Sequence, residues 1–366
     1  NIINIIKNIK QNDKIIYISS YDSLKADLDL YKDYHFSFLV IDEAQFIKNH
    51  FTLKTKAVKE IHTSSRLALT GTPIENNLLD LWSIFDFLMP NYLYDISTFT
   101  NKYILNKTND DELIKKVSLF ILRRTKNEVL NSLPPKTTNI IKVNMSDKQK
   151  DLYKAYYSLA QQSISNPNKL TVLELLLRLR QICVDPSSFL NNYSEISPKL
   201  NLVLNYTKQL IETGHKILIF SSFTSVLNHL QLLLNDEKID NYYLNGQTTS
   251  KDRQYYMENF NNTNDVKVML ISLKAGGTGL NLQGADTVFH IDLWWNSAAE
   301  EQATDRAYRI GQTKPVNVYK FICYNSIEER ILTLQDKKKE LFDTFIKSNE
   351  DGELKLTNDD IKYLLS

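Results

Sequence analysis

Two pairs of charged residues have the types and spacing that phosphate chemistry requires. Arg306 and Arg309 are three residues apart near the end of the stretch Leu273 to Gln312. On a helix this spacing directs both guanidinium groups the same way, so they can reach one triphosphate together. Asp42 and Glu43 follow the apolar run of FLVIDEAQ, which predicts a strand that delivers both carboxylates to a loop at its carboxyl end. An acidic pair there can hold Mg²⁺ and orient water.

These side chains need a scaffold of alternating strands and helices. The β-rich runs are KIIYISS, FSFLVID, RLALT, KILIFSS, VKVMLIS and TVFHID, and longer amphipathic segments separate them. This alternation predicts an α/β fold in which helices cover parallel sheets. One group of strands precedes residue 72 and the other lies within residues 216–292.

The segment between the two groups of strands, residues 78–198, has mostly helical periodicity, as in LWSIFDFLM, KKVSLFILRR and TVLELLLRLRQI. Pro134 and Pro135 interrupt it, and TTNIIKVNMS then alternates like a strand. We therefore expect a crossover between two lobes at residues 133–146.

Composition excludes few functions. The formal net charge is +1, with 44 basic and 43 acidic residues, so any basic groove for nucleic acid requires the charges to be segregated in space. No apolar run reaches the roughly 20 residues that span a bilayer, and no signal-peptide pattern opens the sequence, so we expect a cytosolic protein without a membrane partner. The two cysteines, Cys183 and Cys323, are expected to be buried thiols rather than zinc ligands.

The motifs together resemble one family. FLVIDEAQ, LALTGTPIEN, ILIFSSFT and the stretch ending in RAYRIGQ are similar to motifs of the SWI/SNF branch of superfamily-two helicase-like ATPases, which are DNA translocases. The resemblance continues in family order through YISSYDSL, LWSIFDFLMP, ILRRTKNEVLNSLPPK, LLLRLRQIC and SIEERILTLQDKKKEL. It covers nearly the whole chain and implies two RecA-like lobes, ATP and Mg²⁺ as cofactors, and double-stranded DNA as partner.

The resemblance assigns nucleotide roles in the first lobe. It implies that Asp42 reaches Mg²⁺ and that Glu43 polarises the attacking water, whereas an isolated Asp-Glu pair is commonly a solvated turn. Gln45 is expected to contact the nucleotide or couple the lobes. Thr70, Gly71 and Thr72 would link nucleotide state to DNA grip, although hydroxyls and glycine also suit an ordinary turn.

The resemblance also assigns nucleotide roles in the second lobe. Arg306 and Arg309 would act as arginine fingers, with Gln302 and Asp305 beside them on the same helix. The alternative is a charged helical surface with i,i+3 and i,i+4 pairs. Gly277 and Gly279 would let the backbone approach DNA and nucleotide closely.

DNA contacts are implied for six further residues: Ser222, Thr224, Ser272, Lys274, Trp295 and Asn296. Plainer alternatives exist, because a hydroxyl can cap a helix, a lysine can be a solvated charge and a tryptophan can be core. Arg123 and Arg124 are expected either to form an interlobe ion pair or to contact DNA. The contacts should be mostly to phosphates, with little base readout.

One family element is missing from the 366 residues. A P-loop, G-x-x-x-x-G-K-[ST], binds phosphates in this class, yet none of the nine glycines is followed by lysine. The simplest interpretation is a sequence that starts inside the first lobe and is inactive alone. The rival interpretations are a non-catalytic DNA-binding or scaffold protein that has lost its P-loop, and another superfamily-two enzyme such as an RNA helicase or restriction-type translocase.

The predicted organisation has four parts. Residues 1–77 form a partial RecA-like lobe 1, and residues 78–198 form helical protrusions and the interlobe linker. Residues 199–325 form RecA-like lobe 2, and residues 326–366 form a C-terminal helical brace. The predicted function is the carboxyl-terminal part of an ATP-dependent double-stranded-DNA translocase, with DNA-bound proteins as further candidate partners.

Overall fold

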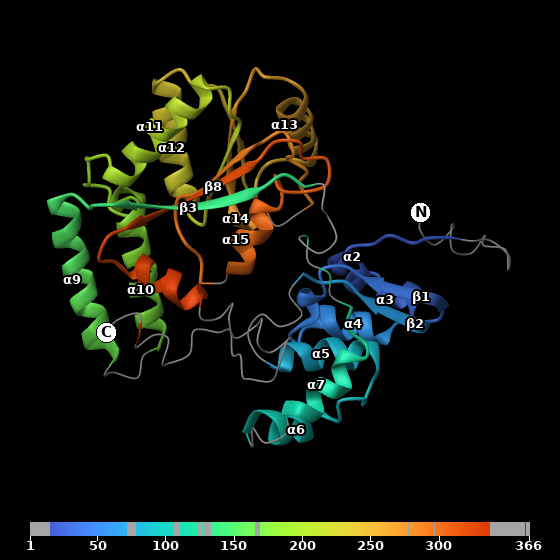
Figure 1. Ribbon diagram of the computed structural model, residues 1–366. Coiled ribbons are helices and arrows are strands. Elements are labelled where there is room, and N and C mark those ends of the chain that lie inside the picture. The colour runs from blue at the N-terminus through green and yellow to red at the C-terminus, as the bar shows by residue number, and fades with distance from the viewer. Residues whose placement is uncertain are drawn as a thin grey trace. The chain divides into compact units, whose positions relative to one another are not determined.

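The computed structural model describes residues 15–71, 78–105, 110–122, 124, 126, 133–164, 169–276, 279–295, 297–336 and 363. A boundary after Leu122 divides them into two compact units, coloured blue to teal and green to red in Figure 1. The predicted division into four parts stays a prediction. No helix in the described ranges is both long and apolar enough to cross a membrane.

The first unit contains a two-stranded parallel sheet and several helices. Its strands are β1 (His35–Ile41) and β2 (His62–Ala68), paired from His35 with His62 to Ile41 with Ala68. Its helical elements are α2 (Tyr21–Ala26), α3 (Leu28–Tyr31), η1 (Ala44–Ile47), α4 (Leu53–Glu60), α5 (Leu78–Leu88), α6 (Ile96–Phe99), η2 (Thr100–Leu105) and α7 (Asp110–Ser118). The strands predicted in FSFLVID and RLALT are thereby confirmed.

The strand predicted in KIIYISS is wrong for its described part, residues 15–20, which have no strand conformation. Ile16 and Ile18 are 88% and 94% exposed. A strand requires a hydrogen-bonded neighbour as well as suitable side chains, and no described strand pairs with this segment.

Apolar side chains at the carboxyl end of β1 hold the first unit together. Ile41 and Ile47 pack with Val58 of α4 and with Ile84 and Phe87 of α5, all buried. A second cluster joins α5, α6, η2 and α7. The helix predicted in LWSIFDFLM is confirmed as α5, whereas that predicted in KKVSLFILRR ends at Ser118.

The second unit contains a six-stranded parallel sheet. Its strands are β3 (Lys136–Val143), β4 (Ile217–Ser221), β5 (Asn241–Leu244), β6 (Val268–Ser272), β7 (Thr287–His290) and β8 (Val316–Cys323), in the order β3-β8-β7-β4-β6-β5. The strand in TTNIIKVNMS is confirmed as β3, which forms an edge of this sheet and pairs with β8 from Lys136 to Val143. Strands β5 and β8 were not among the predicted runs.

Helices cover both faces of this sheet. They are α9 (Asp147–Ile164), α10 (Lys169–Val184), η3 (Pro186–Ser188), α11 (Pro198–Glu212), α12 (Thr224–Asp236), α13 (Ser250–Asn262), α14 (Leu273–Gly276) and α15 (Ser297–Thr304), and residues 327–336 are also helical. Alternate residues of β4 point to opposite faces: Ile217 and Ile219 pack with α11 and α12, whereas Leu218 and Phe220 pack with α13 and α15. The α/β class with parallel sheets is confirmed.

Candidate functional site

The acidic pair lies where the sequence predicts it, just after β1. Asp42 is exposed, and its Oδ1 accepts a hydrogen bond of 2.9 Å from the backbone N–H of Glu43. Glu43 has a left-handed backbone conformation, with φ 51° and ψ 55°. Such a conformation is costly for a non-glycine residue and persists only where the surrounding contacts hold it. Here it turns the chain sharply after the strand, so both carboxylates lie in the short loop between β1 and η1.

Gln45 joins the acidic loop to the turn after β2. Its Nε2 donates to Oε2 of Glu43 at 2.6 Å, and its Oε1 accepts from the Thr70 hydroxyl at 2.8 Å. The backbone reinforces this link, because Ala44 N–H donates to the Leu69 carbonyl at 2.9 Å. The parallel pairing of β1 and β2 brings both carboxyl ends to one edge, and Gln45 makes one polar network of the two motifs.

Tyr21 of α2 closes the network from the other side. Its hydroxyl donates to the Asp42 carbonyl at 2.7 Å. Burial, with the negative charges of Asp42 and Glu43, raises the pKa of Tyr21 to about 12. The phenol therefore stays a neutral donor at physiological pH. Sequence reasoning missed this residue, whose only signal was its place in YISSYDSL.

In the second unit, the strand order reverses between β4 and β7, the position at which α/β sheets usually bind ligands. The loop after β4 and the loop after β7 are joined there by Asp292. Its Oδ1 accepts from the Ser221 hydroxyl at 2.5 Å and from the Ser222 N–H at 2.9 Å. Ser222 thus lies directly after the carboxyl end of β4, where the strand order reverses. Thr224, the first residue of α12, is exposed.

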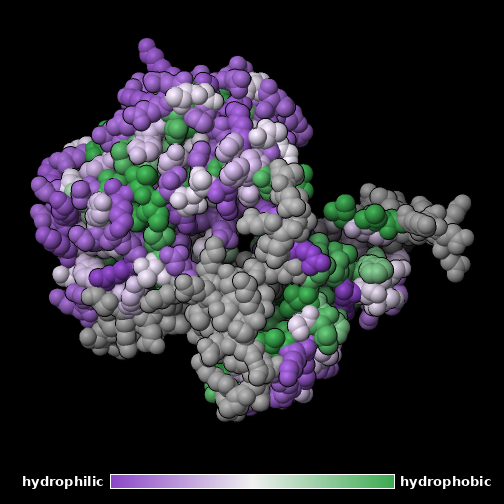
Figure 2. Space-filling model, in the orientation of Figure 1, coloured by the Kyte–Doolittle hydropathy of each residue, from purple (hydrophilic) through white to green (hydrophobic). Residues whose placement is uncertain are grey.

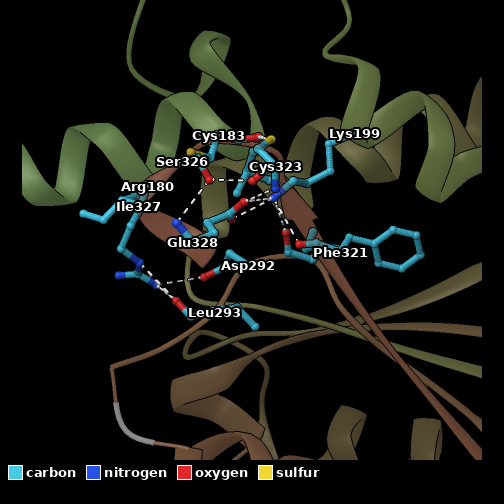
Figure 3. Close-up of polar contacts among 12 residues, drawn as sticks. Arg180, Cys183, Lys199, Asp292, Leu293, Phe321, Cys323, Ser326, Ile327 and Glu328 are labelled. Carbon is cyan, nitrogen blue, oxygen red and sulfur yellow. Dashed lines mark hydrogen bonds and ion pairs between the residues drawn. The ribbon is translucent and has the colours of Figure 1, made fainter. Parts of the chain in front are cut away.

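Arg180 of α10 crosses behind these loops and is 1% exposed. Its guanidinium donates to the Leu293 carbonyl, to Asp292 Oδ2 at 3.0 Å and to the Ser222 hydroxyl at 3.2 Å. Figure 3 shows it directed at Asp292 and Leu293. It also lies 4.8 Å from the Trp294 ring centre and 5.2 Å from that of Trp295. Arg180 therefore fixes both loops. No local pattern indicates this role, because its partners are more than 40 residues away along the chain.

Glu300 of α15 holds the tryptophan loop from the other end. Its Oε1 accepts from the Trp294 N–H at 2.7 Å, and its Oε2 accepts from Lys320 at 2.7 Å. Gln335 donates to the same Oε1 at 2.8 Å. Trp295 is half-buried and packs on the cluster formed by α9, α10 and residues 327–334.

A second buried ion pair lies beside the first. Lys199 Nζ is 2.7 and 2.6 Å from the two carboxylate oxygens of Glu328 and also donates to the carbonyls of Ile291 and Phe321 (Figure 3). This pair connects α11, the sheet and the helical residues 327–336, but contacts none of the predicted site residues.

The two cysteines lie beside this pair. Cys183, Cys323 and Glu328 place three potential ligand atoms within 4.8 Å of one another. Burial raises the pKa of the Cys183 thiol, and Glu328 is already paired with Lys199. These groups therefore have the chemistry of a packed core rather than of a thiolate metal centre.

The predicted helix that carries the arginines is wrong in its extent. Helix α15 ends at Thr304, and Arg306 and Arg309 lie in the turns that follow, where Arg306 N–H bonds to the Ala303 carbonyl and Arg309 N–H to the Ala307 carbonyl. The physical reason is the close packing of this turn, since the Arg306 carbonyl accepts from Leu282 N–H at 3.0 Å. The helical i,i+3 argument for their direction thus does not apply.

The two arginines are half-buried, as is Asp305 beside them. Arg309 Nη1 lies 3.4 Å from the Leu280 carbonyl, which places it against the segment after β6. Asp305 pairs with Lys126 at 2.6 Å, and Lys126 also donates to the Tyr308 carbonyl. Gln302 is half-buried on α15.

The remaining predicted residues follow β2 or β6, lie near the boundary between the two units, or lie outside the described residues. Ser272 is buried, and its hydroxyl accepts weakly from the Ala275 N–H at 3.4 Å. Gly279 is exposed with φ 43°, and Gly71 is exposed. Four predicted site residues lie outside the described residues: Arg123, Thr72, Gly277 and Asn296. Arg124 is exposed, and the side chain of Lys274 also lies outside the described part.

Comparison with known proteins decides the family. Residues 4–188 match the SNF2-related domain, and residues 199–311 match the helicase conserved C-terminal domain. The chain belongs to the SNF2 family. The family resemblance found in the sequence is therefore confirmed, as are two RecA-like lobes as the fold class.

Relatives of the SNF2 chain occur in bacteria and eukaryotes. An ATP-dependent helicase of Mycoplasma genitalium, itself uncharacterised, is 43% identical over 332 residues, which cover 89% of this chain and 32% of the relative. The human SWI/SNF-related matrix-associated actin-dependent regulator of chromatin subfamily A member 1 is 33% identical. That match covers 89% of this chain and 33% of the human protein. The chain thus spans about a third of the length of these curated relatives.

Solved structures match both units of the SNF2 chain. The Sulfolobus solfataricus SWI2/SNF2 ATPase core in complex with double-stranded DNA is 33% identical, with a TM-score of 0.53, and the match covers 98% of this chain and 78% of that one. The Sulfolobus solfataricus SWI2/SNF2 ATPase core domain is 35% identical, with a TM-score of 0.53, and the match covers 98% of this chain and 76% of that one.

Proposed function

We propose that this SNF2 chain is part of an ATP-dependent motor that moves along double-stranded DNA. The observation that carries the proposal is the network Glu43–Gln45–Thr70, which joins an acidic loop to the turn of a second motif at one sheet edge. Family membership and the DNA bound to the Sulfolobus core support the choice of substrates.

The acidic pair fits a role with Mg²⁺ and ATP. Asp42 presents an exposed carboxylate, and carboxylate oxygens suit Mg²⁺. Bound Mg²⁺ would supply charge stabilisation to phosphoryl transfer. We assign Asp42 to hold it and Glu43 to accept a proton from water, with Gln45 fixing the orientation of the Glu43 carboxylate. Because Gln45 also bonds to the Thr70 hydroxyl, we assign Thr70, Gly71 and Thr72 to respond to the nucleotide.

The second unit supplies the other half of the proposed motor. We assign Arg306 and Arg309 to neutralise developing phosphate charge, and Gln302, Asp305, Gly277 and Gly279 to ATP binding and coupling. We assign contacts with the DNA backbone to six residues: Ser222, Thr224, Ser272, Lys274, Trp295 and Asn296. Ser222 and Trp295 support this assignment because Arg180 holds both of them beside the strand-order reversal between β4 and β7.

We further propose that hydrolysis requires a P-loop supplied by a longer protein. The 366 residues contain no such pattern. In the first unit, one face of β1 and β2 is apolar and open: Phe38 and Val40 are 69% and 51% exposed, and Leu67 is 48% exposed. Figure 2 shows hydrophobic surface over this unit. Parallel sheets are normally covered on both faces, so we assign the P-loop segment of the lobe to cover this one.

The test is ATP hydrolysis by the 366-residue chain, beside a version extended upstream to include a G-x-x-x-x-G-K-[ST] loop, each with and without duplex DNA. We expect turnover only from the extended protein, and stimulation by the duplex. Robust turnover by the short chain would refute the need for a supplied P-loop. Silence from both would favour the second candidate, a non-catalytic DNA-binding protein, which the missing pattern also suggests.

A further inference from the structure

A pocket of about 460 Å³ lies in the second unit, outside the site described above. One helical face of α9 forms one wall, because Lys150, Tyr153, Lys154 and Tyr157 recur at intervals of three and four residues. The opposite wall comes from the turn after β8 and the helical residues 327–336, which contribute Arg330. The volume lies in the range of sites for small molecules, about 300–1,000 Å³.

The polar side chains of the pocket are strongly biased toward hydrogen-bond donors. Three are cations, Lys150, Lys154 and Arg330, and none of the lining residues in the described part of the chain is acidic. Arg330 is held in place, because its Nη1 donates to the Tyr157 hydroxyl at 2.8 Å and its guanidinium lies 5.6 Å from the ring centre of Tyr157. Lys150 also contacts Asp147 at 3.1 Å, which offsets part of the charge at one rim. Within the described ranges, Lys154 pairs with no carboxylate.

Two tyrosine hydroxyls add neutral donors. Tyr153 is 8% exposed, and its hydroxyl accepts a hydrogen bond of 2.7 Å from Ile327 N–H. Tyr157 accepts from Arg330 in the same way. A phenol that accepts still has its own hydrogen to donate, and no acceptor for either hydrogen is found among the described residues. A buried donor without an acceptor is unfavourable, so the buried Tyr153 hydroxyl is suited to an acceptor that arrives with a ligand. The half-buried Tyr157 hydroxyl can donate to the same ligand.

We propose that this pocket binds a small phosphorylated anion. Phosphate oxygens accept several hydrogen bonds at once and carry the negative charge that the three cations would attract. Ser326, which directly precedes the helical residues 327–336, also lines the pocket, and the positive end of a helix favours an anion.

The test is calorimetric titration of the 366-residue chain with sodium tripolyphosphate at low ionic strength. We expect one site per chain, and affinity about tenfold weaker for Lys154→Ala and for Arg330→Gln, since each loses a charge-assisted hydrogen bond. Lys154 is exposed, so its variant should fold normally. The matched control is Lys251→Ala, which removes an exposed lysine from α13 and should leave the affinity unchanged.

Three results would overturn the proposal. The first is the absence of saturable binding. The second is equal affinity for the wild type, Lys154→Ala and Lys251→Ala, which would place the anion elsewhere. The third is displacement of tripolyphosphate by duplex DNA together with duplex binding weakened by Lys154→Ala, which would make the pocket part of a DNA path. Because ATP hydrolysis is not measured, none of these results depends on the proposed motor.

Discussion

Arg180 and Asp292 form an ion pair of 3.0 Å in which the two side chains are 1% and 0% exposed. They are separated by 112 residues, and their contact ties α10 to the loops after β4 and β7. A buried charge is tolerated only when it is paired and hydrogen-bonded, and Asp292 satisfies both conditions through Ser221, Ser222 and Arg180. The pair thus fixes the loops that carry Ser222 and Trp295.

Removing one partner of this pair should lower the free energy of unfolding more than replacing both partners by apolar residues. Arg180→Met leaves Asp292 buried without its partner and should lower the free energy of unfolding by about 3–5 kcal/mol. The double variant Arg180→Met with Asp292→Leu should recover part of that loss. Urea unfolding of the second unit, followed by the fluorescence of Trp294 and Trp295, measures both. Equal stability of the single and double variants would contradict the pairing.

The neighbouring pair offers a matched control for the role in DNA binding. Lys199→Met with Glu328→Leu removes an equally buried pair that contacts neither Ser222 nor Trp295. Duplex affinity, measured by fluorescence anisotropy, should fall for the Arg180 and Asp292 double variant and remain unchanged for the control. If both double variants lost the same affinity, the effect would be general destabilisation.

The protonation of His290 should make the free energy of unfolding depend on pH. It is fully buried at the end of β7 with its Nε2 3.0 Å from the Thr304 hydroxyl, and burial, with a smaller effect of Lys320, lowers its pKa to about 3. The unfolded state takes up a proton near pH 6.5, whereas the folded state does not. The free energy of unfolding should therefore fall by up to about 1.4 kcal/mol per pH unit as pH drops below about 6.5. His290→Asn should flatten this slope, and an unchanged slope would show that other groups cause it.

Gly311 should resist substitution because of its backbone. Its φ is +98°, and a Cβ there would approach Gln283 Oε1 to 2.6 Å. Gly311→Ala should cost more than about 1 kcal/mol in thermal or urea unfolding, and adding Gln283→Ala should rescue little, because the strain lies in φ. Gly246→Ala is the control, since nothing lies within 4 Å of its added Cβ. Full rescue by Gln283→Ala would show that the clash, not the backbone, decides.

The proposed role of Arg306 and Arg309 predicts that both are needed for ATP turnover. In the extended protein, Arg306→Ala and Arg309→Ala should each lower ATP turnover by about 10³-fold or more, by analogy with arginine fingers elsewhere. Duplex binding should be retained, as anisotropy can check. A variant that kept its full turnover would remove that residue from the proposed catalytic set.

The sequence predicted the parts of the molecule that depend on local pattern. Alternating apolar strands gave the α/β class, and Asp42 and Glu43 were placed correctly because they directly follow the buried end of β1. Local pattern failed where tertiary contacts decide. The helix expected to carry Arg306 ends at Thr304 because the next turn bonds to Leu282, and residues 15–20 lack a strand partner. The role of Arg180 could not be predicted, because it lies in an apolar helix and nothing in the local sequence indicates an ion pair with Asp292.

The most direct test of the proposed motor concerns Glu43. In the extended protein, duplex-stimulated ATP hydrolysis is compared between the wild type and Glu43→Gln, which keeps the size of the side chain and its contact with Gln45 but removes the base. The proposed role predicts a fall in turnover of about 10²-fold or more with duplex binding unchanged. Turnover within about twofold of the wild type would contradict the assignment of Glu43 as the residue that activates water.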